Sequence, residues 1–118
     1  MKKLILIMLI ALIAASCATK KELPLYNWGT YSQDYYKYLK QNTPETQEKL
    51  IATLNTVIEE QSKTTRQLPP PGVCADLGFL LVQQGKIDEG VALMEREKEY
   101  YPESAQLVNS LIKRIKEN

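Results

Sequence analysis

The sequence predicts an all-α fold in which antiparallel helical hairpins form a short α-solenoid, with about five helices after residue 16. Apolar residues recur at helical spacing along most of the chain after residue 30, which indicates helices that each bury one face. Proline-containing breaks at Pro44, at residues 67–72 and at Pro102 divide this pattern. Three glycines between residues 78 and 90 cost up to about 1 kcal/mol each inside a helix, so they need a structural reason.

Residues 1–16 have the pattern of a lipoprotein signal peptide. Met1-Lys2-Lys3 supplies a basic start, and residues 4–13 are an unbroken apolar run that is shorter than the roughly 20 residues of a membrane-spanning helix. Ala14-Ala15-Ser16-Cys17 follows and resembles a bacterial lipobox, with Ala14 where such motifs more often have leucine. An N-terminal membrane anchor that is never cleaved is the alternative.

Resemblance to the lipobox implies a covalent lipid on Cys17 and no other cofactor. Diacylglycerol would be attached to the Cys17 thiol, residues 1–16 would be removed, and the new amino terminus would be acylated. Ala18 follows in place of the aspartate that retains such proteins in the inner membrane, which implies anchoring in the bacterial outer membrane, facing the periplasm. Cys74 is then the single free thiol, which we expect to be a core residue or, alternatively, intermolecular or reactive.

Charge and composition argue against several classes of function. Lys2 and Lys3 belong to the signal peptide, so the mature chain is nearly neutral and lacks the basic excess of a protein that binds nucleic acid. With no histidine and no cysteine pair at metal-ligand spacing, we expect no metal site. Neither an enzyme nor any catalytic residue is expected. The acidic residues that could do such chemistry are interpreted as solvated, and they are Glu59, Glu60, Glu95, Glu97 and Glu99.

Residues 17–29 are expected to be a lipidated tether followed by an aromatic entry segment, and residues 18–25 make up most of the tether. Residues 30–66 are expected to form the first helical hairpin. Its first helix runs from Thr30 to Gln41, with Ser32 available as the N-cap. Thr43-Pro44-Glu45 begins the second helix, which continues to about Lys63. The expected apolar faces are Tyr31, Tyr35, Tyr38 and Leu39 on the first helix, and Leu50, Ile51, Leu54, Val57 and Ile58 on the second.

Residues 71–104 have the spacing of a tetratricopeptide repeat, a two-helix unit of roughly 34 residues. Gly78 and Gly90 stand where the two helices cross most closely, and Gly85 stands where a left-handed residue ends the first helix. Glu97 replaces the usual alanine, which indicates a second helix that ends more exposed. A generic helical hairpin is the alternative. The expected helices are 72–84 and 87–101, and the expected packing residues are Cys74, Leu77, Gly78, Leu81, Gly90, Met94 and Pro102.

Residues 105–118 are expected to form a C-terminal capping helix, at about residues 104–117. One repeat cannot bury both of its own faces, so we expect the first hairpin and this helix to cover its two sides. The expected apolar face of the capping helix is Leu107, Val108, Leu111, Ile112 and Ile115.

Two surfaces are candidate binding sites. Resemblance to the repeat family implies a partner-binding surface lined by Gly72, Ala75, Phe79, Val82 and Gln83. Because Phe79 and Val82 are apolar, they are suited to anchor a peptide, unless the preceding hairpin packs over them. The second surface is aromatic and either recognises a partner or fills the open end of the first hairpin. Its residues are Tyr26, Trp28 and Tyr31.

The order of these motifs is similar to that of a family of small bacterial lipoproteins filed as a domain of unknown function. The motifs are the lipobox, Tyr26-x-Trp28-Gly29-x-Tyr31, the tyrosine-rich helix, the Pro-Pro-Gly joint, Leu77-Gly78-x-Leu80 and the Glu-Tyr-Tyr-Pro-Glu-Ser of residues 99–104, so the resemblance covers residues 17–115. Members are often encoded beside a lipoprotein that resembles the curli secretion channel. The resemblance implies such a lipoprotein as a partner.

We therefore expect a lipid-anchored adaptor of the cell envelope that binds a protein partner through its repeat-like surface. It would be accessory to an envelope assembly or secretion complex. The alternative is a stand-alone structural or ligand-holding lipoprotein that binds peptidoglycan or a peptide.

Overall fold

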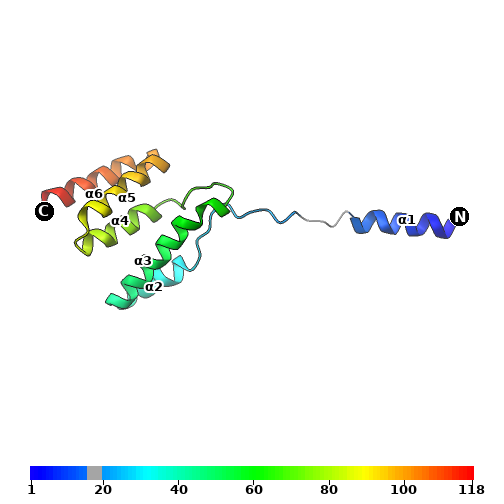
Figure 1. Cartoon of the computed structure of the whole chain (residues 1–118), viewed down its shortest axis with the longest axis horizontal. Coiled ribbons are helices and arrows are strands. Elements are labelled where there is room, and N and C mark those ends of the chain that lie inside the picture. The colour runs from blue at the N-terminus through cyan, green and yellow to red at the C-terminus, as the bar shows by residue number, and fades with distance from the viewer. Residues whose placement is uncertain (16–19) are drawn as a thin grey trace.

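The structure is a computed structural model that describes residues 1–15 and 20–118. Among these residues it consists of helices joined by turns and loops, with no strand (Figure 1). This confirms the predicted all-α fold with about five helices after residue 16. In chain order the elements are α1 (Lys2–Ala15), α2 (Tyr31–Gln41), α3 (Pro44–Glu59), the 3-10 turn η1 (Glu60–Lys63), α4 (Val73–Gln83), α5 (Ile87–Tyr100), the 3-10 turn η2 (Pro102–Ser104) and α6 (Ala105–Glu117).

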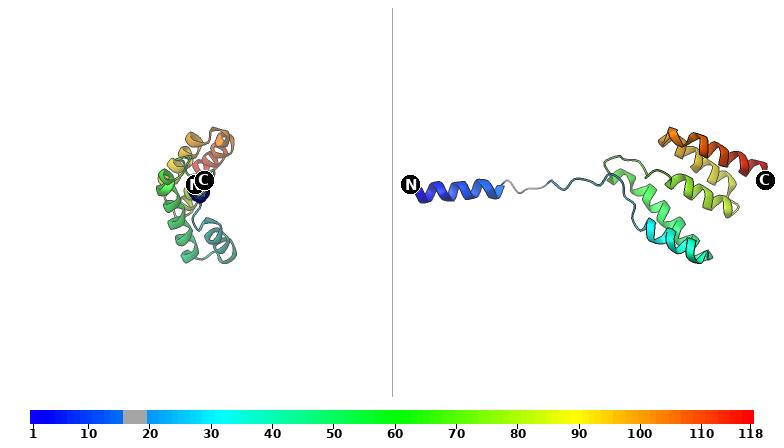
Figure 2. Two further views of the ribbon diagram at one scale, coloured as in Figure 1. Left: turned by 90° about the vertical axis from the view of Figure 1, so that its right-hand side faces the viewer. Right: turned by 180° about the vertical axis from the view of Figure 1, so that it is seen from behind.

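Helices α2 to α6 follow a curved path, with α2 and α6 at its two ends (Figure 2). Helix α1 lies apart from this curve, at the far end of the chain that leads into α2 (Figure 1). In the part of the chain that the structure describes, no helix combines the length and the apolar content needed to cross a bilayer. Cys17, the predicted lipidation site, lies outside the described residues.

A tight connection joins α2 and α3 into the first hairpin. Asn42 follows α2 in the left-handed conformation, with φ 45°, and its N–H donates to a carbonyl of the last turn. Thr43 then caps α3 as the sequence predicts, because its hydroxyl accepts from Thr46 N while Thr46 Oγ1 accepts from Thr43 N. The predicted cap at Ser32 is wrong, since α2 begins at Tyr31 and Ser32 lies within its first turn.

Two clusters of buried apolar side chains hold the helices together. The larger cluster joins the first hairpin to α4, and the smaller one joins α5 to α6. Leu39 and Leu107 were expected on buried faces but are 64% and 66% exposed. Each of these two leucines is adjacent in sequence to a residue that packs against the core, so its side chain points about 100° away from that residue around the helix. The buried members are Leu50, Leu54, Val57, Val73, Leu77, Leu80 and Leu81 in the larger cluster, and Met94, Val108 and Ile112 in the smaller.

Helices α4 and α5 cross at two glycines, as their spacing predicts. A Cβ added to Gly78 would lie 2.5 Å from Gly90 O, and a Cβ added to Gly90 would lie 2.5 Å from Gly78 O. The two backbones therefore approach too closely for any side chain at these positions. Gly85, with φ 83°, ends α4 in the left-handed conformation, and the N–H groups of Gly85 and Lys86 donate to carbonyls of the last turn.

Glu97 is buried, which shows that the prediction of a solvated Glu97 at an exposed end of α5 is wrong. The residue is 3% exposed, and its Oε1 accepts the N–H of Gly72 at 2.7 Å. Gly72 precedes α4 and has no side chain with which to cap it, so Glu97 supplies the oxygen that accepts at this end of the helix. Burial raises the pKa of Glu97, although the backbone N–H groups of Gly72, Ala75 and Cys74 oppose this shift.

Cys74 lies in the core of the second hairpin, which consists of α4 and α5. A core position was the first of the two expectations for this residue. Its side chain is fully buried. Burial, with a smaller contribution from Glu97, raises the pKa of the thiol to about 11. The thiol is therefore protonated at neutral pH and packs as a small apolar group, which argues against the alternative of a reactive cysteine.

Tyr101 fixes the joint between the two hairpins. The joint contains two buried prolines, Pro69 and Pro70. The hydroxyl of Tyr101 donates to Pro69 O at 2.6 Å and lies 3.4 Å from the hydroxyl of Tyr26. The Tyr101 side chain, directly after α5, therefore contacts both the proline-containing joint and the segment that precedes α2.

We expect Tyr101→Phe to lower the free energy of unfolding by about 1 to 2 kcal/mol, because it leaves the buried carbonyl of Pro69 without its donor. Urea unfolding followed by the fluorescence of Trp28, the only tryptophan, measures the loss. Tyr36→Phe is the matched control, since Tyr36 is 63% exposed. Equal stability of the two variants would contradict the role of the Tyr101 hydroxyl.

The chain that precedes α2 is docked onto the loop after η1. Thr65 donates its N–H to Pro24 O and its hydroxyl to Leu23 O, both at 2.9 Å, and Arg66 N donates to Leu25 O at 3.4 Å. The predicted tether at residues 18–25 is therefore too long, because its last three residues are part of the folded domain. No local sequence pattern indicates these bonds, because they join segments far apart in the chain.

Candidate partner-binding face

Two tyrosines of α2 reach across to α4. The hydroxyl of Tyr31 donates to Asp76 Oδ2 at 2.8 Å, and the hydroxyl of Tyr38 donates to Gln83 Oε1 at 3.2 Å. Both pairs are 45 residues apart, so α2 and α4 run in the same direction and in register. Stacked repeats of an α-solenoid place their equivalent helices in this way.

The aromatic side chains at the start of α2 form a continuous row. The rings of Trp28 and Tyr31 are 5.3 Å apart and tilted, and those of Tyr31 and Tyr35 are 5.5 Å apart and stacked. Tyr31, Tyr35 and Tyr38 also pack against the larger core cluster. We call this row, together with the side of α4 that it contacts, the α2–α4 face. It comprises Trp28, Tyr31, Tyr35, Tyr38, Ala75, Asp76, Phe79 and Gln83.

Phe79 is the exposed apolar residue of α4 on this face. It lies three residues after Asp76 and four before Gln83, within about one helical turn of each, and so between the two hydrogen bonds to α2. It is nevertheless 46% exposed, and Ala75 one turn before it is half-buried. The first hairpin therefore covers the edge of the predicted binding surface and leaves its middle open.

The polar groups of the α2–α4 face are hydrogen-bonded to one another across the two helices. Burial, followed by the hydrogen bond to Asp76 and its charge, raises the pKa of Tyr31 far above its usual value, so Tyr31 remains a donor. Burial also raises the pKa of Asp76, and the hydrogen bond from Tyr31 opposes that shift. Gln83 accepts a second hydrogen bond, from Gln47 Nε2 at 3.4 Å. These groups orient the two helices, and the chemistry left for a partner is aromatic and apolar.

Other predicted site residues lie elsewhere. Val82 points toward α5, since its Cγ2 would lie 2.6 Å from a Cβ on Gly90. Tyr26 is next to Tyr101 at the joint, apart from the hydrogen bonds that link α2 to α4. Of the residues expected to pack the second hairpin, Cys74, Leu77, Gly78, Leu81, Gly90 and Met94 are buried, whereas Pro102 is exposed and begins η2 two residues after the end of α5.

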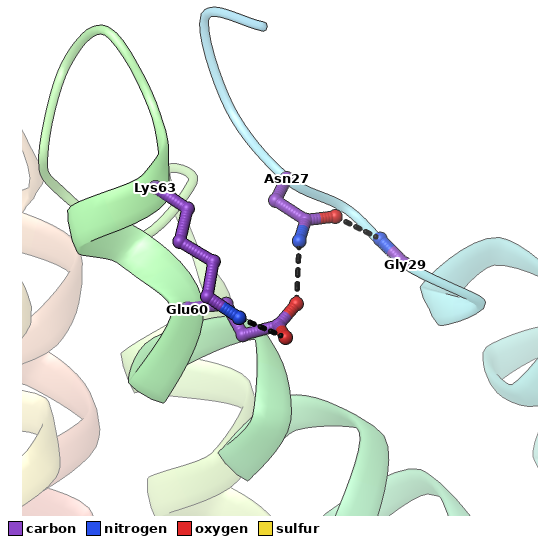
Figure 3. A network of polar contacts seen from close by, with 4 residues as sticks. All are labelled: Asn27, Gly29, Glu60 and Lys63. Atoms are coloured by element: carbon purple, nitrogen blue, oxygen red, sulfur yellow. Dashed lines mark hydrogen bonds and ion pairs between the residues drawn. The ribbon is translucent and has the colours of Figure 1, made fainter. Parts of the chain in front are cut away.

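A shallow hollow of about 270 Å³ lies between the segment before α2 and the outer side of α3. Asn27 closes one end of it, because Asn27 Nδ2 donates to Glu60 Oε2 at 2.7 Å and Asn27 Oδ1 accepts from Gly29 N at 3.0 Å (Figure 3). Glu60 Oε1 also pairs with Lys63 Nζ at 2.9 Å. The Glu60 side chain is half-buried and its two oxygens are bonded to Asn27 and Lys63, so it is less exposed to solvent than was expected. The lining is completed by Thr30, Lys49, Ala52, Thr53, Thr56 and Val57.

A buried carboxylate lies behind this hollow. Asp34 Oδ2 accepts from Thr30 Oγ1 and from Thr53 Oγ1, each at 2.6 Å, and thereby links α2 to α3. Burial by itself would raise the pKa of Asp34, but the two hydroxyls and the nearby Lys49 lower it below its usual value. Asp34, Thr53 and Asp76 were not predicted as site residues. The only signal in the sequence was that Asp34 and Asp76 are charged residues on the apolar sides of predicted helices.

Comparison with known proteins identifies one family. A family model described as "Domain of unknown function (DUF4810)" matches residues 25–111, which is more than half of the chain. No curated protein and no solved structure matches the chain. The match includes the α2–α4 face and ends within α6.

Proposed function

The chain belongs to the family described as DUF4810, a domain of unknown function, and we propose that it is a lipid-anchored adaptor of the bacterial cell envelope that binds a protein partner. The α2–α4 face is the proposed binding surface. The observation that carries the proposal is Phe79, which stays 46% exposed between two hydrogen bonds that fix the helices around it. An exposed ring on a rigid aromatic surface is typical of an anchor point for a partner.

The lipid anchor is supported by the amino-terminal sequence. The basic start, the apolar run and the small residues before Cys17 form the pattern of a lipoprotein signal peptide. Helix α1, formed by that run, is shorter than a bilayer span. We propose attachment to the outer membrane on its periplasmic side, with Cys17 carrying the lipid.

The proposed partner is a protein of an envelope assembly or secretion complex. Resemblance to the lipoprotein family makes a lipoprotein similar to the curli secretion channel the first candidate. The repeat-like pairing of α4 and α5 supports a scaffold role, because such units present a surface and carry no chemistry of their own.

A photo-crosslinking amino acid placed at Phe79 tests this proposal in cells. We expect one crosslinked partner from position 79 and none from position 36, because Tyr36 is 63% exposed on α2 but is not part of the α2–α4 face. Phe79→Ser should weaken the affinity for that partner by at least about tenfold, since it removes the exposed aromatic ring that is proposed to anchor the partner.

Leu39→Ala is the matched control for Phe79→Ser, because Leu39 is 64% exposed on α2 and is not a member of the larger core cluster. It should leave the affinity unchanged. Wild-type recovery of the partner by Phe79→Ser, with the folded structure intact, would exclude the α2–α4 face as the binding surface.

The hollow beside α3 favours a second candidate function, a ligand-holding lipoprotein that binds peptidoglycan. Its lining combines hydroxyls, an amine and a carboxylate, the groups that recognise a polar ligand. Co-sedimentation of the purified protein with isolated sacculi separates the two functions. Binding that is lost in Thr56→Val and kept in Phe79→Ser would favour the ligand-holding function.

A further inference from the structure

We infer that the domain makes a second, non-covalent contact with the membrane, in which a small patch rests on the surface of an anionic phospholipid bilayer. The juxtamembrane patch consists of Lys20, Lys21, Leu23, Leu25 and Arg66. The inference rests on the proposed lipid anchor at Cys17 and adds an orientation to it.

The length of free chain brings the patch close to the bilayer. Hydrogen bonds from Thr65 and Arg66 hold the carbonyls of residues 23–25 on the folded domain. Six residue steps separate Cys17 from Leu23, and a fully extended chain spans at most about 20 Å over that length. A lipid on Cys17 therefore keeps Leu23 within about 20 Å of the lipid headgroups, and Leu25, eight residue steps from Cys17, within about 28 Å.

The chemistry of the patch fits a membrane surface. Leu23 and Leu25 are 61% and 54% exposed although they belong to the docked segment. Lys20, Lys21 and Arg66 are also exposed, and none of them forms an ion pair within residues 20–118 as described. Glu22 is the one acidic residue between positions 20 and 25, so the patch has a net positive charge. Exposed apolar side chains flanked by basic residues favour the interface of an anionic bilayer.

The arrangement of the helices is compatible with this contact. The chain enters the domain beside the loop after α3, and α2 then runs away from the entry point (Figure 1). With the patch on the bilayer, the end of α2 at Gln41 and the end of α4 at Gln83 would extend away from it. The α2–α4 face would remain accessible to a partner in the periplasm.

Depth-dependent fluorescence tests the inference in the full, lipidated protein. Trp28→Phe removes the only tryptophan and keeps an aromatic ring, and Leu25→Trp then places a single reporter in the patch. Leu39→Trp in the same background is the matched control, because Leu39 is similarly exposed on α2. Both proteins are reconstituted into vesicles of phosphatidylethanolamine and phosphatidylglycerol that contain brominated phospholipid.

We expect the brominated lipid to quench most of the fluorescence at position 25 and none at position 39. Adding Lys20→Glu and Lys21→Glu, or replacing phosphatidylglycerol with phosphatidylcholine, should reduce the quenching at position 25. Vesicle flotation of the same samples reports on the anchor separately. If the protein floats with the vesicles but the brominated lipid quenches the tryptophan equally at positions 25 and 39, the inference is overturned and the anchor is left intact. A protein that does not float overturns the proposed anchor and this inference with it.

Discussion

Gly78→Val will destabilise the domain more than any other single substitution considered for this chain, by about 3 kcal/mol or more. The new side chain meets backbone, because even a Cβ at this position lies 2.5 Å from Gly90 O and 3.0 Å from Met94 Cγ. Carbonyl oxygens of a helix cannot rotate aside as side chains do, so α4 and α5 must separate and expose the buried core between them. Urea unfolding of the purified protein, followed by helical circular dichroism, measures the effect.

Gly85→Ala is the matched control for this prediction. Gly85 has φ 83°, and no atom lies within 4 Å of a Cβ built on it, so alanine meets conformational strain there but no clash. We expect a loss of about 1 kcal/mol. If Gly78→Val were no less stable than Gly85→Ala, the close approach of α4 and α5 would be incorrect.

Glu97→Ala is expected to have the second largest effect, a loss of about 2 kcal/mol in the free energy of unfolding. The substitution removes the acceptor of the Gly72 N–H at the start of α4. Because Gly72 has no side chain, the N-cap residue itself cannot replace this acceptor. Glu99→Ala, on the exposed side of the same helix, is the control and should change stability little.

Glu97→Gln separates the hydrogen bond from the charge. The amide oxygen can still accept from Gly72 N, so we expect most of the stability to remain at neutral pH. The pKa of Glu97 is raised by burial above its usual value of 4.5, in keeping with Oε2, which is buried and has no hydrogen-bond partner among the described residues. The folded state therefore holds its proton more strongly than the unfolded state does.

The sign of the pH dependence follows from that raised pKa. The contribution of Glu97 to stability is fully present below its unfolded pKa and is lost as the pH rises through the folded pKa. Asp76 acts in the same direction and Asp34 in the opposite one, so only the difference between wild type and Glu97→Gln isolates Glu97. That difference should favour the wild type most at mildly acidic pH. A constant difference between pH 4 and pH 8 would show that Glu97 does not titrate in this way.

Local features of the fold could be predicted from the sequence because their causes are local. The cap at Thr43 and the helix end at Gly85 depend on a few neighbouring residues, and both are confirmed. The crossing of Gly78 and Gly90 was predictable for a different reason. The backbones of α4 and α5 approach so closely there that no side chain fits. Two glycines at the spacing of a two-helix repeat therefore indicate the crossing point.

Features that depend on distant pairing could not be predicted. Glu97 lies on a charged stretch of α5, at helical spacing from the buried Gly90 and Met94, but its partner, the N–H of Gly72, is 25 residues away and could not be identified from the sequence. The bonds of Tyr31 and Tyr38 to α4 join residues 45 apart, and the loop between the hairpins sets that register. The sequence therefore predicted Phe79 as a binding residue but assigned Val82 to the same surface, although Val82 packs against α5.

The docking of residues 23–25 also determines how mechanical tension enters the domain. Immediately after these residues, Tyr26 lies beside Tyr101 in the second hairpin, and Asn27 bonds to Glu60 at the end of the first. A pull on the amino terminus is therefore divided between both hairpins before it reaches α2. If the proposed lipid anchor and partner are correct, force between them would pass through both hairpins without first separating the helices.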